Sequence, residues 1–301
     1  MRIGFIGAGK VGFSLGKFFV SRNIQVTGYY SRHQESAKEA AKFTETKFYK
    51  DISMLIKDSD AIFVTVPDGQ IRVVYDQLKE MEISEKQICH CSGAMSSKEA
   101  FPDANEHGAF GYSIHPLFPV SSKYDSYQKL ADAFFCLEGD LAHMNDWVTL
   151  FQNIGVKTRM IESENKVKYH AACAIASNLV CALFAESMEL LEACGFEKEE
   201  ALEALSPLAK SNMEQILSCG PIGALTGPIE RGDSLTVSKH LACFKNKDDR
   251  SMYTSVSRKL ISMAKEKHPE KNYKELEDTK LTVVQGINNN EIDISSIKTV
   301  V

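Results

Sequence analysis

Hydrophobic and polar positions follow two different periods along the first half of the chain. Four short apolar runs have the length and composition of buried strands: Ile3–Ile6, Gln25–Tyr30, Ala61–Val66 and Gln87–Cys91. Segments with helical spacing of apolar residues separate them, at about 11–21, 34–43, 53–57 and 70–79. This alternation predicts a doubly wound parallel sheet. Strand-like runs at 111–115, 133–137 and 156–160, with a helix at 142–153, would extend that sheet.

After Ile161 the pattern becomes helical. The segment Glu164–Cys194 is rich in apolar residues and contains neither glycine nor proline, which predicts one long helix. Further helices are expected at about 197–218, 235–245 and 249–267. We therefore predict an α/β fold in which a Rossmann-like sheet domain, residues 1–161, precedes an all-α domain, residues 162–280. The polar segment 281–301 is expected to form an irregular tail.

The charge balance narrows the classes of partner. Lys and Arg number 35 against 40 Asp and Glu, and the net charge of −5 argues against a basic face for duplex nucleic acid. No uninterrupted apolar run approaches the roughly 18–20 residues of a membrane span. The chain enters a strand at Ile3, which leaves no room for a signal peptide. We therefore expect a cytoplasmic protein that binds neither nucleic acid nor a membrane.

The eight cysteines are expected to be mostly small buried hydrophobes, because no export signal precedes them. The triplet Cys89-His90-Cys91 has the residue types of a zinc site. On a strand, however, His90 points to the face opposite both cysteines. No second ligand pair has zinc-site spacing, so we expect no metal.

A glycine pattern directly follows the first strand and opens the first helix, in the context that dinucleotide binding requires. Gly7 permits the tight turn, Gly9 lets the backbone approach a pyrophosphate, and Gly12 allows close contact between helix and strand. The pyrophosphate would accept hydrogen bonds from the N–H groups of the helix N-terminus. The alternative is a glycine-rich turn without a ligand. The predicted cofactor contacts in this loop are Gly7, Ala8, Gly9, Lys10, Val11 and Gly12.

The end of the second strand distinguishes NADP from NAD. An NAD enzyme usually has Asp or Glu there, which accepts a hydrogen bond from the ribose. This strand ends Tyr30-Ser31-Arg32, without a carboxylate. Ser31 can donate to a 2′-phosphate and Arg32 can bind it through two hydrogen bonds, so we predict NADP in preference to NAD. Arg32 could also be only a solvated surface residue. The loop Thr65–Asp68, after the fourth strand, is expected to contact the nicotinamide through its backbone, with Val66 and Pro67 as the predicted contacts.

These residues resemble those of a known group of proteins. The N-terminal half resembles the Rossmann domains of the 6-phosphogluconate dehydrogenase superfamily, which includes pyrroline-5-carboxylate reductase, prephenate dehydrogenase and the 3-hydroxyisobutyrate dehydrogenases. The whole chain, from residue 1 to about 265, is similar to bacterial Rossmann-like proteins with a C-terminal domain of unknown function, often named NADP oxidoreductases. The resemblance implies a fold and a cofactor class but no substrate. The segments that carry it are Lys168–Ala172, Ala176–Asn178, Ser206–Leu208, and 224–233 followed by Val237 and His240.

Hydride transfer needs a proton donor and groups that orient the substrate, and the start of the long helix offers both. Lys166, His170 and Asn178 share one helix face within a drift of about 40°. In the resembled hydroxyacid dehydrogenases a lysine is followed four residues later by asparagine, and here His170 takes the place of that asparagine. We expect His170 to be the proton donor, because imidazole titrates near neutral pH. The alternative is a histidine hydrogen-bonded to backbone at a helix start.

Two further clusters carry candidate groups. Ser92-Gly93 follows the fifth strand, and His115-Pro116 ends the sixth, where it resembles the His-Pro of prephenate dehydrogenases. In those enzymes the histidine contacts the reacting hydroxyl; alternatively, His115 is structural. The second cluster is the segment 226–233, similar to a helix connection that lines the active site of the partner subunit in pyrroline-5-carboxylate reductase. That resemblance implies that Thr226 and Arg231 bind an anionic group; alternatively, the segment is a turn capped by Asp233 or Ser234.

These patterns predict an NADP-dependent reductase or dehydrogenase that acts on a small, anionic carbonyl, imine or hydroxy compound. An NADP-binding sensor and a deazaflavin–NADP oxidoreductase are the alternatives. We expect a cleft between the domains, with walls of Val66-Pro67, Ser92-Gly93 and His115, closed by Lys166–His170. A helix that is apolar around most of its circumference must be buried on all sides, so we also predict a two-fold homodimer through the helical domains.

Overall fold

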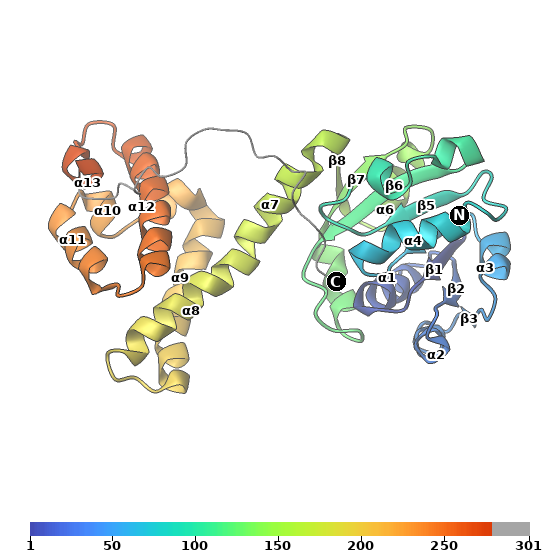
Figure 1. Ribbon diagram of the computed structural model, residues 1–301, viewed down its shortest axis with the longest axis horizontal. Coiled ribbons are helices and arrows are strands. Elements are labelled where there is room, and N and C mark those ends of the chain that lie inside the picture. Colours follow the sequence, from blue (N-terminus) through green and yellow to red (C-terminus); the bar gives the residue numbers. More distant parts are fainter. Residues whose placement is uncertain (279–301) are drawn as a thin grey trace. The chain divides into compact units, whose positions relative to one another are not determined.

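The structure, a computed structural model, describes residues 1–278 (Figure 1). The chain divides into two compact units, Met1–Val180 and Cys181–Val301, and each is described by itself. The predicted tail at 281–301 lies outside the described residues. The predicted boundary at residue 161 stays a prediction: helices follow the sheet directly, and the two units divide inside the helix α8 (Asn178–Glu192).

The first unit is built on one sheet, with strand order β3-β2-β1-β4-β5-β6-β7-β8 in the described residues. All seven predicted strands are present, and only the two-residue β3, too short to give a pattern, was missed. Every pairing is parallel except that of β6 with β7. The strands are β1 (Ile3–Ile6), β2 (Val26–Tyr30), β3 (Lys47–Phe48), β4 (Ala61–Val64), β5 (Gln87–His90), β6 (Phe110–Leu117), β7 (Phe134–Gly139) and β8 (Lys157–Met160).

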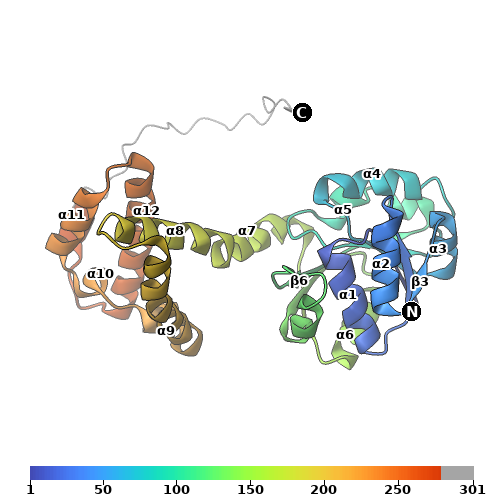
Figure 2. The same ribbon diagram turned by 90° about the horizontal axis from the view of Figure 1, so that it is seen from below.

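Helices cover both faces of this sheet (Figure 2). The helices α1 (Lys10–Ser21), α2 (Gln34–Thr44) and α6 (Met144–Asn153) bury an aromatic core against one face. The helices α3 (Ile52–Asp58), α4 (Asp68–Leu78) and α5 (Ser97–Ala100) bury a second, more aliphatic core against the other. Short 3-10 turns at 104–107, 126–132 and 163–165 complete the connections. The doubly wound α/β arrangement predicted from the sequence is therefore confirmed.

The strand order reverses between β1 and β4, because β1 pairs with β2 on one side and with β4 on the other. In open α/β sheets the loops at the carboxyl ends of the strands separate at such a point and leave a crevice for a ligand. The loops after β1 and β4 therefore flank the place where a dinucleotide is expected.

The register of β6 places polar side chains on one face of the sheet. His115 lies opposite Cys136 of β7, Ser113 lies opposite Glu138, and His90 of β5 is level with Ser113. Because side chains alternate across a strand, the residues between them point to the aromatic core instead. This part of the sheet thus offers hydrogen-bonding groups, and not apolar ones, to the element that packs on it.

That element is α7 (Lys166–Ala176), which starts after the 3-10 turn at 163–165. It lies along β6: Lys166 contacts Ser113 and, one turn later, Tyr169 contacts His115. The prediction of one uninterrupted helix over 164–194 was wrong, because Ser177 has non-helical angles (φ −128°, ψ −79°) and separates α7 from α8. The sequence gives no glycine or proline signal for this break.

Side chains of α7 and α8 are largely exposed. Lys166 is the only buried residue of α7, and α8 has none. The segment Ser163–Glu192 is, by length and composition alone, apolar enough to cross a bilayer, with a window of mean hydropathy 1.6. The apolar side chains of this segment are therefore largely exposed in the described part of the chain.

The described part of the second unit is all helical, as predicted. After α8 it contains α9 (Lys198–Ala224), α10 (Pro228–Arg231), α11 (Ser234–Cys243), α12 (Lys247–Lys267) and α13 (Lys274–Asp278). The helix α9 is kinked at Gly220, which has φ 76° and precedes Pro221. A small core includes Val237, Ile261 and Tyr273. The fold class predicted from the sequence is confirmed.

Candidate functional site

The glycine loop between β1 and α1 is fixed by the neighbouring strand ends. Gly7 has φ +100°, and a Cβ on it would lie 2.6 Å from the carbonyl oxygen of Thr65, so only glycine fits. The Gly7 N–H donates to the Tyr30 carbonyl at 2.8 Å, and the Thr65 hydroxyl donates to the Gly7 carbonyl at 2.9 Å. A side chain on Gly12 would collide with the Thr65 hydroxyl at 2.5 Å, as close packing of helix and strand requires. The sequence predicted only a backbone role for the loop that contains Thr65, and this role of its side chain was missed.

The loop leaves the N-terminus of α1 open to an anion. Gly9 is the N-cap, no side chain caps the helix, and its first turn, from Lys10, contains no acidic residue. The first N–H groups of this helix are therefore free to bind a phosphate, with the helix dipole in their favour. The nearest heavy atom to a Cβ on Gly9 would be 4.0 Å away, which leaves room for a ligand. These features fit the pyrophosphate of a dinucleotide.

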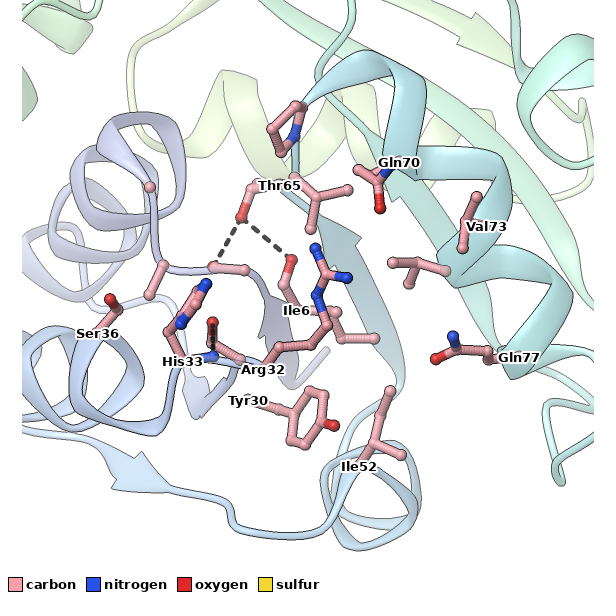
Figure 3. Close-up of a pocket in the computed structure, with 17 residues that line it drawn as sticks. Ile6, Tyr30, Arg32, His33, Ser36, Ile52, Thr65, Gln70, Val73 and Gln77 are labelled. Atoms are coloured by element: carbon pink, nitrogen blue, oxygen red, sulfur yellow. Dashed lines mark hydrogen bonds between the residues drawn. The ribbon is translucent and has the colours of Figure 1, made fainter. Parts of the chain in front are cut away.

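A cavity of about 260 Å³ adjoins the loop (Figure 3). Its lining includes Ser31, Arg32 and His33 after β2, and Val66 and Pro67 after β4, but no Asp or Glu. The side chain of Arg32 extends into the cavity and makes no ion pair with the described residues (Figure 3). A cavity with a free guanidinium and no carboxylate favours a phosphorylated ribose over a free 2′-hydroxyl.

A second cluster forms where α7 meets the ends of β5 and β6. Lys166 is 1% exposed, and its Nζ donates to the Ser92 carbonyl at 2.9 Å and to the Ser113 hydroxyl at 2.7 Å. Burial lowers the pKa of Lys166, although nearby groups, among them the carboxylates of Glu138 and Asp68, oppose the shift. A hydrogen bond from a charged donor contributes about 1.5–3 kcal/mol, which offsets part of the cost of burying the ammonium. Lys166 thus ties α7 to the sheet.

Ser92 is held at each of its polar atoms. Its N–H donates to Nδ1 of His90 at 3.1 Å, and its carbonyl accepts from Lys166. Its hydroxyl donates to Oδ2 of Asp68 at 2.6 Å and accepts from the N–H of Met95 at 3.1 Å. The side chain is buried, and the one proton of its hydroxyl is already used by Asp68. This geometry favours a role for Ser92 in fixing the turn, with Asp68 as a partner that sequence reasoning missed.

Two imidazoles flank the backbone of Gly93. A Cβ on Gly93 would lie 2.3 Å from Nδ1 of His170 and 3.1 Å from Nε2 of His115, so glycine lets both rings approach. The ring centroids of His115 and His170 are 6.3 Å apart. His170 is exposed, whereas His115 is partly buried and its Nδ1 lies 2.6 Å from the Tyr169 hydroxyl. Three segments that are distant in the sequence therefore meet here.

Burial, and then the charges of Lys166 and His170, lower the pKa of His115 to about 4. His115 is therefore neutral at pH 7. Because the unfolded histidine titrates near 6.5, the unfolded chain binds more protons between roughly pH 6.5 and 4, and this group's contribution to stability falls as the pH falls through that window. A neutral imidazole acts here as a hydrogen-bond partner and not as an acid.

Asn178 does not share the regular helix face on which it was predicted. The break at Ser177 separates it from Lys166 and His170, and its Oδ1 accepts a hydrogen bond from the Ser177 hydroxyl at 3.2 Å. Its predicted role stays a prediction, without the geometric basis of a continuous helix.

The cysteine triplet has the predicted orientation. Cys89 and Cys91 pack with the aromatic core, whereas His90 faces the opposite side and contacts Phe101 edge-on. The expectation of mostly buried cysteines was wrong, because only two are buried and four are exposed: Cys181, Cys194, Cys219 and Cys243. No group of His, Cys, Asp or Glu in residues 1–278 could hold a metal ion.

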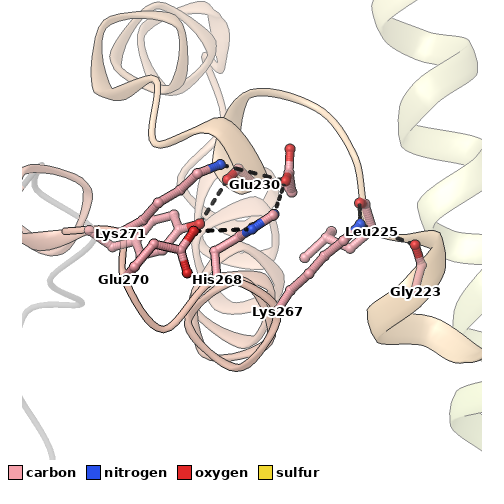
Figure 4. Close-up of polar contacts among 8 residues, drawn as sticks. Gly223, Leu225, Glu230, Lys267, His268, Glu270 and Lys271 are labelled. Atoms are coloured by element: carbon pink, nitrogen blue, oxygen red, sulfur yellow. Dashed lines mark hydrogen bonds and ion pairs between the residues drawn. The ribbon is translucent and has the colours of Figure 1, made fainter.

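In the second unit, the turn that bears Thr226 and Arg231 is anchored from α12 and the segment after it (Figure 4). The Nζ of Lys267 donates to the carbonyls of Gly223 at 3.1 Å and Leu225 at 2.7 Å. Tyr273 donates to the Glu230 carbonyl at 2.8 Å, and His268 pairs with the Glu230 carboxylate.

Thr226 and Arg231 are exposed, and the side chain of neither makes a hydrogen bond with the described residues. Asp233 caps α11 by accepting from the N–H of Thr236 at 2.9 Å, which confirms the cap suggested by the sequence. In the described residues Arg231 and Asp233 form no ion pair.

Two family descriptions match separate parts of the chain. Residues 2–90 match the family described as "NADP oxidoreductase coenzyme F420-dependent", and residues 133–260 match "Domain of unknown function (DUF2520)". The resemblance inferred from the sequence is thereby confirmed, as are the oxidoreductase class of the N-terminal domain and NADP as its cofactor. A relative from Methanothermus fervidus, described as an uncharacterised 28.5 kDa protein, is 39% identical over 66 residues, and this match spans 22% of the chain and 26% of that protein.

Solved structures resemble the chain over most of its length. Protein TM1727 from Thermotoga maritima is 28% identical, with a TM-score of 0.71 over 88% of this chain and 99% of that one. An imine reductase from Myxococcus stipitatus in complex with NADP⁺ is 18% identical, with a TM-score of 0.56 over 88% and 93%. A 1-pyrroline-5-carboxylate reductase from Streptococcus pyogenes is 15% identical, with a TM-score of 0.61 over 88% and 98%. The last two similarities show the fold alone.

Proposed function

We propose that this chain, an NADP oxidoreductase by the family of its N-terminal domain, transfers a hydride between NADP(H) and a small anionic carbonyl, imine or hydroxy compound. One observation carries the proposal: a carboxylate-free cavity beside the glycine loop and a pair of imidazoles at Gly93 both lie at the carboxyl edge of one sheet. The first site suits the phosphorylated ribose, and the second suits proton transfer at the reacting group.

NADPH, when bound, supplies the hydride, and the residues of this chain bind and orient the reactants. His170 is the proton donor in this proposal, because its imidazole is exposed and its Nδ1 lies against Gly93. The buried Lys166 holds the Ser92 carbonyl and favours negative charge nearby. Thr226 and Arg231, both exposed, are proposed to bind the anionic group of the substrate.

A deazaflavin–NADP oxidoreductase is the second candidate, because the family matched by residues 2–90 carries that description. The two candidates differ in the second reactant. Reduction of coenzyme F420 by NADPH, without turnover of small oxo or imino acids, would favour the second candidate. A sensor would bind NADPH without oxidising it in the presence of any of these compounds.

Cofactor preference tests the N-terminal half of the proposal. We expect NADPH to bind at least tenfold more tightly than NADH, and Arg32→Ala to weaken NADPH binding about 10- to 100-fold with little effect on NADH. The physical reason is the loss of a charge-assisted hydrogen bond to the 2′-phosphate, worth about 1.5–3 kcal/mol. Isothermal calorimetry with both cofactors measures this.

Arg22→Ala is the matched control, because Arg22 lies at the opposite end of α1. Its substitution should leave both affinities unchanged. Equal affinity of the wild-type protein for NADPH and NADH would contradict the assignment of Arg32.

A homodimer is the second part of the proposal. On α7 and α8 the side chains of Val167, Ile175 and Leu179 are 69%, 61% and 54% exposed. Contiguous apolar surface of this kind indicates a contact with another molecule. A second copy of the chain suits it better than a bilayer, because Ser177 interrupts the helix and Lys166 and Lys168 lie at its start. We therefore also expect the protein in the soluble, cytoplasmic fraction.

Sedimentation equilibrium at micromolar concentration should give twice the chain mass of 33.5 kDa. Ile175→Glu should shift the protein toward monomer, because it adds a charge to the proposed interface. Leu141→Glu is the control, since Leu141 is 79% exposed in the loop after β7, and it should leave the mass unchanged. A wild-type monomer, or a protein that needs detergent to stay in solution, would refute the dimer.

A further inference from the structure

We propose that Tyr169 fixes His115 as the tautomer with its proton on Nε2, and that this N–H donates a hydrogen bond to a substrate oxygen. The substrate would then be an oxo compound, or the corresponding alcohol in the reverse direction, and not a protonated imine. This inference rests on the proposed function above, and it selects one substrate class among those that the function allows.

The tautomer follows from one short contact. The hydroxyl oxygen of Tyr169 lies 2.6 Å from Nδ1 of His115, within hydrogen-bond distance. A neutral imidazole has one donor and one acceptor nitrogen, so the role of Nδ1 determines that of Nε2. If Nδ1 accepts the phenol proton, Nε2 must carry the hydrogen.

The surroundings favour the phenol as donor. Burial, with the thiols of Cys136 and Cys173 nearby, raises the pKa of Tyr169, so the phenol keeps its proton at neutral pH. Burial lowers the pKa of His115 to about 4, so the imidazole is neutral and one of its nitrogens must accept. Among the groups near the phenol, an imidazole nitrogen is a far better acceptor than a thiol sulfur.

The Nε2–H then lies beside Gly93. Nε2 lies 3.1 Å from the position of a Cβ on Gly93, and among residues 1–278 it has no hydrogen-bond partner. His170 borders the same space from the next residue of α7, with its Nδ1 2.3 Å from that position. The Nε2–H of His115 therefore lies beside the exposed imidazole of His170 and is available to donate a hydrogen bond to a ligand.

Other charged groups around His115 also favour an oxygen acceptor. Lys166 lies one turn before His170 on α7, and its ammonium is buried. Its positive charge acts on the imidazole of His115. On the sheet side, the carboxylates of Asp68 and Glu138 are already bonded to serine hydroxyls. An iminium ion would bring a positive N–H against the donor of His115 and close to the charge of Lys166.

With NADPH bound, the cofactor would supply a hydride, with its two electrons, to the carbonyl carbon and would become NADP⁺. The π bond of the carbonyl breaks, and its electron pair stays on the oxygen. The imidazolium of His170 gives its proton to that oxygen, which forms the hydroxyl, and His170 later regains a proton from water. His115 transfers no proton: its Nε2–H stabilises the charge on the oxygen, and Tyr169 acts as a positioning residue.

Nitrogen-15 NMR of the histidine-labelled protein tests the tautomer without turnover. At pH 7 the wild-type protein should show His115 protonated on Nε2 alone, and Tyr169→Phe should show a mixture of the two tautomers. Tyr124→Phe is the matched control, because Tyr124 bonds to Glu39 instead, and it should leave His115 unchanged. A wild-type His115 protonated on Nδ1, or on both nitrogens, would overturn the inference.

The probe for the ligand is oxamate, a 2-oxo acid analogue that is not reduced, added with NADP⁺. It should move the Nε2–H resonance of His115 in the wild-type protein and bind about tenfold more weakly to Tyr169→Phe, while NADP⁺ affinity stays constant. An unmoved resonance, or a loss of NADP⁺ affinity in Tyr169→Phe, would show that His115 serves something other than the substrate.

NADPH oxidation with a panel of 2-oxo acids and cyclic imines separates this inference from the proposed function. We expect turnover of oxo acids only, with kcat about tenfold lower and KM less changed in Tyr169→Phe. Turnover of the imines alone would overturn the inference and leave the proposed function standing. Turnover of no compound would overturn the proposed function, whereas the tautomer and oxamate results would still decide the role of Tyr169.

Discussion

Replacing His170 by Gln is expected to lower kcat for NADPH oxidation by about 10²–10⁴-fold and to leave NADPH affinity nearly unchanged. The imidazole is the one exposed titratable group against Gly93 in the described residues, since Lys166 is buried and His115 is neutral at pH 7. Glutamine keeps a hydrogen-bonding group of similar reach but cannot give a proton. The loss therefore falls on the chemical step and not on cofactor binding.

Stopped-flow measurement of NADPH oxidation under single-turnover conditions gives the rate of that step. His240→Gln is the control, because His240 is also exposed on a helix, where it bonds to Tyr253. It should keep the wild-type rate. A His170→Gln protein with full activity would remove His170 from the mechanism and leave water as the proton donor.

Gly93→Ala is expected to lower kcat about 100-fold while the protein stays folded. The new methyl group would lie 2.3 Å from Nδ1 of His170 and 3.1 Å from Nε2 of His115, so at least one ring must move. His170 is exposed and can rotate outward, which relieves the collision at a cost of about 1–3 kcal/mol. The displaced imidazole then no longer reaches the reacting oxygen.

Gly69→Ala is the matched control, because a Cβ there would meet no atom within 4 Å. It lies in α4 and should leave kcat unchanged and the melting temperature equal or higher, since alanine favours the helix. Thermal unfolding measured beside kcat distinguishes the two effects. A Gly93→Ala protein with normal kcat would show that catalysis does not depend on the observed positions of the His115 and His170 rings.

The alternation of strands and helices was readable from the sequence because each strand of a parallel sheet is buried on both faces. The glycine loop could also be predicted from the sequence. Gly7 has a positive φ and Gly12 lies close to the side chain of Thr65, and glycine is the residue that satisfies both requirements. The two-residue β3 left no such pattern, and the pattern that predicted β7 as a strand did not reveal its antiparallel direction. Strand direction depends on the path of the connection, which a single strand's pattern does not record.

The candidate site was predicted in part. His115, His170 and Lys166 were selected because imidazole and ammonium groups near a sheet edge are chemically distinctive. The side-chain roles of Thr65, Asp68 and Tyr169 were missed, because these roles depend on partners distant along the chain. Asp68 bonds to a residue 24 positions away and Tyr169 to one 54 positions away. Only the register of the sheet brings these pairs together.

The break at Ser177 had no local signal. No glycine or proline marks the position, and the modest helix propensities of Ser177 and Asn178 are too weak to predict a break. The prediction of a shared face for Lys166, His170 and Asn178 assumed regular geometry over three turns, and one residue with non-helical angles was enough to invalidate it for Asn178.

The ammonium of Lys166 closes two large loops of chain, because its bonded partners lie 74 and 53 residues earlier. Contacts of such sequence separation form late in folding, after most of the chain entropy has been lost. The site around Gly93 cannot exist in a partly folded chain, since β5, β6 and α7 must all be in place before Lys166 finds its acceptors. Recovery of activity during refolding therefore marks the end of the folding reaction, whereas fluorescence of Trp147, in the aromatic core on the opposite face, reports the earlier collapse.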